Sequence, residues 1–280
     1  MISQIAYASA VEIAERRSGR LGDGVYAGRP WALIQRNIFA LRTTNSLVFF
    51  SGFVEPVFYL MAFGFGLGNF VGDVSDAGSA KMSYAMFIAP ALLATSAMNG
   101  ALADSTWNVF FKMHYAKFYN AVMATSLGAL DAAAGEIGWA MIRGAAYSVG
   151  FMCIVTPLGL VPSAWGILAI PAAALIALGF AAVGMGVTSY LSSHQQMNWV
   201  NFFLLPMFLF SGAFFPLDAY PVVAQWLIHA LPLWQGIAML RSLMYGVMDL
   251  ALLGHVVYFI VFAIAGIAFT TRRLNALFLR

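Results

Sequence analysis

The amino-acid sequence contains long apolar stretches that charged residues seldom interrupt. Only 9% of its 280 residues are Asp, Glu, Lys or Arg, whereas 62% are hydrophobic. A water-soluble chain of this length carries far more ionised groups, so most of this surface must face lipid. A helix needs about 20 apolar residues to cross the hydrocarbon core of a bilayer. The sequence therefore predicts an all-α protein that crosses a membrane repeatedly.

Six stretches are long and apolar enough to be predicted as transmembrane helices. They lie at about 47–68, 83–102, from Glu136 to near Pro157, and at about 165–190, 199–215 and 252–271. Between the fifth and sixth, Pro216, Pro221 and Pro232 break an apolar sequence into short pieces. We expect re-entrant or interfacial helices there, because irregular backbone at membrane depth must be buried in protein or line a wet cavity.

The basic residues indicate the orientation of these spans. Twelve of the 14 Lys and Arg residues lie on one side if both termini are cytoplasmic, which leaves Lys81 and Arg241 outside. Cytoplasmic loops of membrane proteins carry such an excess. We therefore expect a cytoplasmic tail at 1–46, a six-span membrane domain at 47–271 and a cytoplasmic tail at 272–280.

Two polar or amphipathic segments lie on the expected inner side. The pattern from Trp31 to Arg42 predicts an amphipathic elbow helix at the membrane interface. It could couple a cytoplasmic partner to the spans, or it could be a plain membrane anchor. A hydrophilic segment with Asp104, Lys112, His114 and Lys117 follows the second span and is predicted to be the first inner loop.

The sequence offers little that an enzyme would use. A Walker-type ATP-binding loop needs a Gly-Lys pair, and none of the three lysines follows a glycine. Any ATP hydrolysis must therefore belong to another chain. The four histidines lack metal-ligand spacing, the single cysteine excludes an intrachain disulfide, and the basic residues form no continuous patch for nucleic acid. We expect this chain to bind no cofactor, metal or nucleic acid.

Ionisable residues inside the spans are candidate functional groups, because each costs about 2.5–3.5 kcal/mol at a helix centre. Glu55, which precedes Pro56, could contact a substrate or pair with another span; a protonated or hydrogen-bonded glutamate at a helix contact is the alternative. Glu136 and Arg143 share one helix face two turns apart, so we expect their partners on neighbouring helices. Close helix packing is predicted at Gly64, Gly66, Gly68, Gly179, Gly184 and Gly186.

The order of these features resembles the permease subunits of type-2 ABC exporters. The fragments that carry the resemblance are Glu55-Pro56, Tyr59-Leu60, Gly64-Phe65-Gly66-Leu67-Gly68, Ala94-Thr95-Ser96-Ala97-Met98, Asp131, Gly135-Glu136, Trp139-Ala140, Phe210-Ser211-Gly212-Ala213-Phe214-Phe215-Pro216-Leu217-Asp218, Leu231-Pro232-Leu233 and Leu240-Arg241. The likeness covers about residues 30–275. Among these permeases, the chain is most similar to the NodJ group, which exports lipo-oligosaccharides. Daunorubicin-type permeases are more distant relatives.

The resemblance implies a multi-pass protein of the bacterial inner membrane, paired with a second permease copy as a homodimer or with a sister permease. Two copies of a separate ATPase subunit would hold the ATP and magnesium. A short coupling helix within 118–131 would dock on that ATPase. The candidate contacts are Tyr119, Asn120, Ser126, Leu127, Leu130 and Asp131. Many relatives carry a proline here, where this chain has Ser126-Leu127-Gly128; a solvated inner loop without a partner is the alternative.

The expected function is ATP-driven export of an amphiphile such as a lipo-oligosaccharide, glycolipid, polysaccharide precursor or drug. The expected substrate path runs past Glu55, Glu136 and Arg143 to Phe214 and Phe215, while the substrate's lipid tail stays among membrane lipids. Two other classes stay open: an ion-coupled secondary transporter or channel that needs no ATPase, and an assembly subunit without a transport path. The first often has paired broken helices in both halves, and this sequence shows only one broken region.

Overall fold

The computed structural model describes residues 28–43, 54–74, 81–125 and 127–278. Within these ranges, five helical segments are long and apolar enough to cross a membrane. They are Val54–Val71, Tyr84–His114, Ala129–Val155, Ala164–Thr188 and Leu250–Phe278. The pair Val222–Ala230 and Pro232–Tyr245 raises the number of candidate spans to six if it counts as one. The predicted all-α membrane architecture is confirmed at this level.

The first span changes its helical winding along its length. From Leu60–Leu67 it is a π-helix, η1, and it ends in the short α4, Gly68–Val71. Two short strands of two residues each follow, and β1 (Asp73–Val74) pairs antiparallel with β2 (Met82–Ser83). The part of this span predicted at 47–53 lies outside the described residues.

The second span is the central helix of the bundle and is longer than predicted. It runs without interruption through α5 (Tyr84–Leu102), the π-helical η2 (Ala103–Asn108) and α6 (Val109–His114). The predicted end near residue 102, with a hydrophilic loop beyond it, is wrong. The charged residues of this segment stay helical because they find partners on the next span.

The next elements form a short connection and the third span. Lys117, in the left-handed conformation with φ +45°, begins the turn into α7 (Phe118–Met123). The third span, α8, is Ala129–Val155 and therefore begins seven residues before Glu136. In the fourth, the 3-10 helix η3 (Ala164–Leu168) leads into α9 (Ala169–Thr188), close to the predicted 165–190.

The fifth predicted span is the largest departure. After η4 (His194–Gln196), helix α10 is only Met197–Leu209, whereas we expected a span to residue 215. Its 13 residues give about 20 Å of helix, less than the hydrocarbon thickness of about 30 Å. The chain turns at Gly212, where φ is +68° and Arg241 Nη2 donates to the carbonyl oxygen at 2.8 Å.

The region of predicted broken helices is present as two helices joined at a sharp bend. After η5 (Leu217–Ala219), α11 (Val222–Ala230) and α12 (Pro232–Tyr245) meet at 85°. Pro232 begins α12 at a position where the missing N–H costs nothing. The last span, α13, is Leu250–Phe278, so residues predicted as the tail from 272 continue the helix.

Small residues let the spans approach closely. A Cβ added to Gly144 of α8 would lie 2.6 Å from Ala177 of α9 and 2.6 Å from the carbonyl oxygen of Ala97 in α5. A Cβ added to three of the predicted packing glycines, Gly179, Gly184 or Gly186, would likewise lie under 3 Å from a side chain of another helix. Gly64 packs on Ala85 and Gly68 more loosely on Tyr84. The prediction fails at Gly66, which meets only the carbonyl oxygen of Met61 in its own helix.

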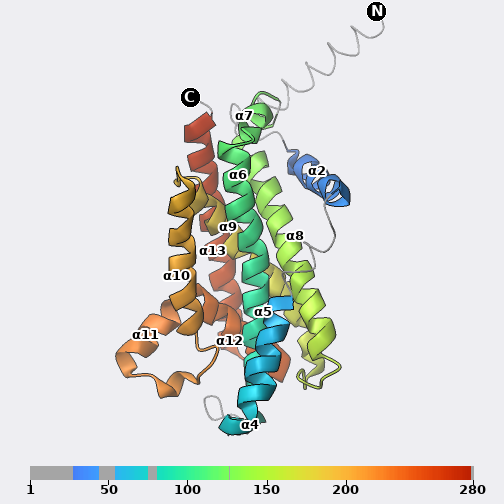
Figure 1. Ribbon diagram of the computed structural model, residues 1–280, viewed down its shortest axis with the longest axis vertical. Coiled ribbons are helices and arrows are strands. Elements are labelled where there is room, and N and C mark those ends of the chain that lie inside the picture. Colours follow the sequence, from blue (N-terminus) through green and yellow to red (C-terminus); the bar gives the residue numbers. More distant parts are fainter. Residues whose placement is uncertain (1–27, 44–53, 75–80, 126, 279–280) are drawn as a thin grey trace, which may run out of the picture.

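The bundle has two distinct ends (Figure 1). Helix α2 (Pro30–Thr43), α7 and the C-terminal end of α13 lie at one end, and α4 and α11 lie toward the other. The helix expected from Trp31 to Arg42 is present as α2, which packs its Leu33 against α8 and exposes Trp31 and Phe39. Its role as an elbow at the membrane interface stays a prediction. An apolar side left open is what an interfacial helix presents to lipid.

Candidate functional site

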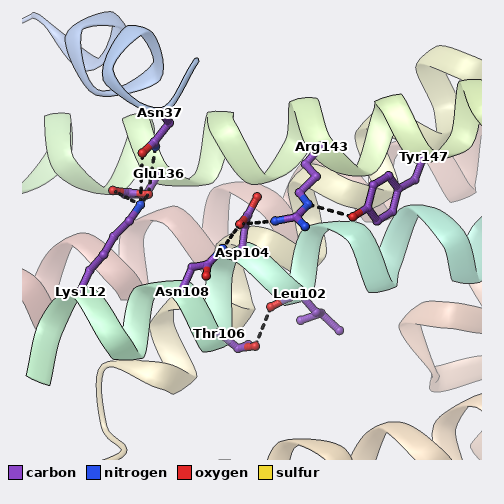
Figure 2. Close-up of polar contacts among 9 residues, drawn as sticks. All are labelled: Asn37, Leu102, Asp104, Thr106, Asn108, Lys112, Glu136, Arg143 and Tyr147. Carbon is purple, nitrogen blue, oxygen red and sulfur yellow. Dashed lines mark hydrogen bonds and ion pairs between the residues drawn. The ribbon is translucent and has the colours of Figure 1, made fainter. Parts of the chain in front are cut away.

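A buried ion pair joins three helices at the end of the bundle that carries α7 (Figure 2). Lys112 Nζ of α6 lies 2.7 Å from Glu136 Oε2 of α8, and their side chains are 17% and 2% exposed. Asn37 Nδ2 of α2 donates to the same carboxylate oxygen at 3.3 Å. A buried pair with such hydrogen bonds is strongly harmed when one partner is removed. This cluster therefore holds α2, α6 and α8 in one arrangement.

Helix α7 is attached to this cluster by aromatic contacts. The guanidinium of Arg36 in α2 lies 3.9 Å from the ring centroid of Phe118. Tyr119 is fully buried, and its ring lies 6.1 Å from that of Phe278 in α13. Burial, with a smaller contribution from the Glu136 carboxylate, raises the pKa of the Tyr119 hydroxyl well above its usual value. A push on α7 would thus reach α2 and α13 directly.

Asp131 fixes the start of α8. Its Oδ1 accepts the backbone N–H of Arg29 at 2.8 Å, and its Oδ2 accepts that of Gly128 at 3.0 Å. A carboxylate in the first turn also interacts favourably with the helix dipole. Since Asp131 is fully buried, its side chain orders the α7–α8 turn from inside.

The predicted coupling residues therefore have different positions. Tyr119 and Asp131 are buried, Asn120 is exposed, and Leu127 and Leu130 are partly exposed. Ser126 lies outside the described residues. Docking of this segment on an ATPase stays a prediction; among the described candidate contacts Asn120 is the most accessible, and Leu127 and Leu130 are partly accessible.

A second ion pair lies deeper in the bundle. Arg143 Nη1 of α8 lies 2.8 Å from Asp104 Oδ1 of η2, with side chains that are 15% and 4% exposed. Arg143 Nε donates to the hydroxyl of Tyr147 at 3.0 Å, and Asn108 Nδ2 donates to Asp104 Oδ1 (Figure 2). The expectation that Glu136 and Arg143 find partners on a neighbouring helix is confirmed, in both cases on the second span.

The structure brings Glu55 and Arg143 to one cavity of about 320 Å³. Glu55 comes from the first span, Asn99 from α5, Trp107 from η2 and Asn201 from α10. With Arg143 of α8, side chains from five elements thus meet at one cavity between the helices. Cavities that combine a few converging polar groups with apolar walls are common small-molecule sites.

The other predicted path residues lie elsewhere. Glu136 belongs to the Lys112 cluster and does not line this cavity. Phe214 is partly buried between two aromatic rings, with centroids 5.2 Å from Phe63 and 5.1 Å from Phe208. Phe215 is 57% exposed. The structure therefore unites two of the five path residues and separates the other three.

The sequence itself contains a signal for these partners, which the predicted loop after the second span leaves unused. Asp104 and Lys112 are eight residues apart, and Glu136 and Arg143 are seven apart, so each pair shares one helix face. The order of charges is negative then positive in both pairs. Antiparallel helices with this order place opposite charges together. Because the predicted second span ends near residue 102, Asp104 and Lys112 fall in a loop, where no common helix face is expected.

Comparisons with known proteins agree with this architecture. A model of the ABC-2 type transporter family matches residues 30–245. Nodulation protein J of Rhizobium leguminosarum bv. trifolii is 32% identical over 216 residues, which cover 77% of this chain and 80% of the relative. Nodulation protein J of Neorhizobium galegae is 28% identical over 251 residues, or 87% and 93% of the two chains. This chain therefore belongs to the ABC-2 type transporter family, as a multi-pass bacterial inner-membrane permease of the nodulation protein J type.

Proposed function

We propose that this transporter subunit exports an amphiphilic substrate, and that two copies of a separate ATPase subunit supply the energy. The candidate substrates are a lipo-oligosaccharide, a glycolipid, a polysaccharide precursor or a drug. The observation that carries the proposal is the Lys112–Glu136–Asn37 cluster, because it connects the accessible α7 segment to two spans and α2. A chain that receives mechanical work from a partner needs such a connection.

The proposed coupling element is the segment from α7 to the start of α8. Asn120 and Leu127 would contact the ATPase, and Leu130 would extend this surface. Tyr119 and Asp131 would hold this surface in place from the protein interior, since both are fully buried. Closure of the ATPase pair would move α7, and the ion pair would carry that displacement into α6 and α8.

ATP and magnesium would be held by the partner ATPase, since no lysine of this chain follows a glycine as a Walker-type loop requires. A second permease copy, most simply identical to the first, would complete the path. Within one copy, Glu55 and Arg143 would contact the polar head of the substrate, and Phe214 and Phe215 would lie near its exit. Glu136 would reach the path only if its pair with Lys112 opens.

The coupling proposal is tested by replacing accessible residues of the α7 segment, the exposed Asn120 and the partly exposed Leu127. We expect Leu127→Arg and Asn120→Trp to reduce co-purification with the cognate ABC ATPase and stimulation of its activity at least about tenfold. Leu227→Arg is the matched control, because Leu227 is 68% exposed on α11, toward the opposite end of the bundle (Figure 1). Undiminished ATPase binding and stimulation in both α7-segment variants would contradict the docking assignment.

Transport measurements separate the proposal from a transporter that works alone. Proteoliposomes with the permease and its ATPase should accumulate substrate only with ATP, and Glu55→Gln should slow that transport. Substrate movement by the permease without the ATPase would favour the ion-coupled or channel alternative. Normal transport by Glu55→Gln would remove Glu55 from the essential residues.

A further inference from the structure

A groove lies on the surface of the bundle where α13 packs beside the start of α8. Its volume is about 370 Å³, and the residues that line it are Leu130 of α8 and Ile264, Ile267, Ala268, Thr271 and Arg272 of α13. We propose that this groove binds an anionic phospholipid of the surrounding membrane, with an acyl chain on the apolar wall and the phosphate at Arg272. The inference depends neither on the exported substrate nor on the ATPase.

The α13 residues form one continuous wall with an apolar part and a polar end. Successive turns of the helix place positions 264, 267, 268, 271 and 272 on the same face. From Ile264 to Arg272 the helix rises about 12 Å, and the polar residues come last. The C-terminal end of α13 lies at the end of the bundle that carries α7 (Figure 1), so Arg272 lies nearer to that end than Ile264 does. A phospholipid has the same order, because its chains lie deeper in the bilayer than its phosphate.

The apolar part of the groove is open to the outside of the bundle. Ile264 is 63% exposed and Ala268 is also exposed, although both lie inside the candidate span Leu250–Phe278. Exposed apolar side chains of a span face either lipid or another membrane helix. The positive charge at the end of this wall favours lipid over a second copy of the chain. The carboxylates described at this end, those of Asp131 and Glu136, are buried and already bound within their own copy.

Arg272 gives the groove a positive charge that the described part of the protein does not neutralise. It is the only ionisable residue among those that line the groove, and it forms no ion pair with a described carboxylate. A guanidinium presents its donors in a planar fork that fits two phosphate oxygens. A zwitterionic lipid would bring a cationic group along with its phosphate. We therefore expect the groove to prefer a phospholipid with a net negative charge.

Thr271 gives a second, independent indication of a ligand. The hydroxyls of Thr95, Thr106 and Thr188 each donate to the carbonyl oxygen four residues earlier. The Thr271 hydroxyl oxygen is also buried, yet it has no hydrogen-bond partner among the residues that the structure describes. Leaving a buried donor unpaired is costly. A phosphate beside Arg272 would supply the acceptor after a rotation about χ1 of Thr271.

Lipid binding to the purified full chain in detergent tests this inference. Dioleoyl phosphatidylglycerol and dioleoyl phosphatidylcholine share both chains and the phosphate and differ in net charge, and native mass spectrometry measures the affinity of the first lipid bound. We expect phosphatidylglycerol to bind about fivefold more tightly, the preference that one arginine near an anionic lipid provides. Arg272→Gln should reduce this preference to less than about twofold, and Arg272→Lys should keep most of it because the charge remains.

The controls use residues of the same type outside the groove. Arg29→Gln removes the same charge from an exposed arginine that does not line the groove, and it should leave the preference unchanged. Ala268→Phe should fill the groove and weaken phosphatidylglycerol binding about tenfold. Ala265→Phe adds the same ring to an exposed alanine of the same helix that does not line the groove, and it should bind like the original chain. Both alanines are exposed, so both variants should fold.

Several results would overturn the inference. These are equal affinity for the two lipids, a preference that Arg272→Gln keeps or Arg29→Gln abolishes, and equal phosphatidylglycerol binding by Ala268→Phe and Ala265→Phe. Competition by excess inorganic phosphate would indicate a site for a soluble anion instead. A dimer that Ala268→Phe dissociates and Ala265→Phe does not would assign the groove to a second copy. The assay contains neither ATPase nor transported substrate, so its failure leaves the proposed function untouched.

Discussion

Lys112 Nζ lies 2.7 Å from Glu136 Oε2, although the two residues belong to different spans. The pair lies beside Asn37 of α2 and near Phe118 of α7, whose ring centroid is 6.0 Å from the same ammonium. Four separate helices thus meet at one salt bridge. Movement of any of them must either carry the others along or break this pair.

Removing the Lys112 ammonium should destabilise the protein strongly. In Lys112→Met the Glu136 carboxylate stays buried without its cation, which costs about 3–5 kcal/mol in comparable pairs. We expect a clear fall in the midpoint of thermal unfolding in detergent. The double variant Lys112→Met with Glu136→Leu should regain much of this loss, because it leaves no unpaired charge. A double variant no more stable than the single one would count against this account.

Variants of the Arg143–Asp104 pair should show how much of its stabilisation depends on charge and how much on the shape of the guanidinium. Arg143→Met leaves the Asp104 carboxylate 4% exposed without its guanidinium partner, so it should lower the unfolding midpoint more than Arg143→Lys. Lysine can keep the charge near Asp104 but cannot reproduce the planar arrangement that also reaches Tyr147. Tyr147→Phe, which removes one hydrogen bond, should cost only about 1 kcal/mol. Equal losses in the methionine and lysine variants would refute this ranking.

The crossing of α5, α8 and α9 should not tolerate a methyl group. In Gly144→Ala the new Cβ would lie 2.6 Å from both Ala177 Cβ and the Ala97 carbonyl oxygen. Overpacking of this kind costs about 1–3 kcal/mol. Gly254→Ala in α13 is the matched control, since its added Cβ would meet no atom within 4 Å. Thermal unfolding should show a loss for Gly144→Ala and none for Gly254→Ala; similar curves would contradict the packing argument.

Asp131 should act through the start of α8 and not as a contact. Asp131→Ala removes the acceptors of the Arg29 and Gly128 backbone N–H groups, a loss of about 1–2 kcal/mol. Asp131→Asn keeps one acceptor oxygen and should lose less. Measured on folded protein, ATPase binding of Asp131→Asn should stay within about twofold of the original chain. A large loss of binding without a loss of stability would make Asp131 a docking residue.

The sequence was sufficient for the spans whose apolar character is unbroken. The fourth span was predicted at 165–190 and is Ala164–Thr188, and the prolines correctly marked the bend between α11 and α12. The physical reason is that lipid supplies no hydrogen-bond partners, so an apolar run must satisfy its backbone groups as a helix. Local sequence is enough to decide this.

Only the tertiary structure determines whether the charged residues after position 102 lie in a loop or in a helix. Asp104 and Lys112 were predicted in a loop because an isolated charge is costly in a span. Both stay helical because Arg143 and Glu136, on another helix, offset that cost. The cavity likewise depends on Glu55 and Asn201, which lie 146 positions apart in the chain. Apolar burial is readable from neighbours in sequence, whereas the energy of a charge depends on groups that only folding brings near it.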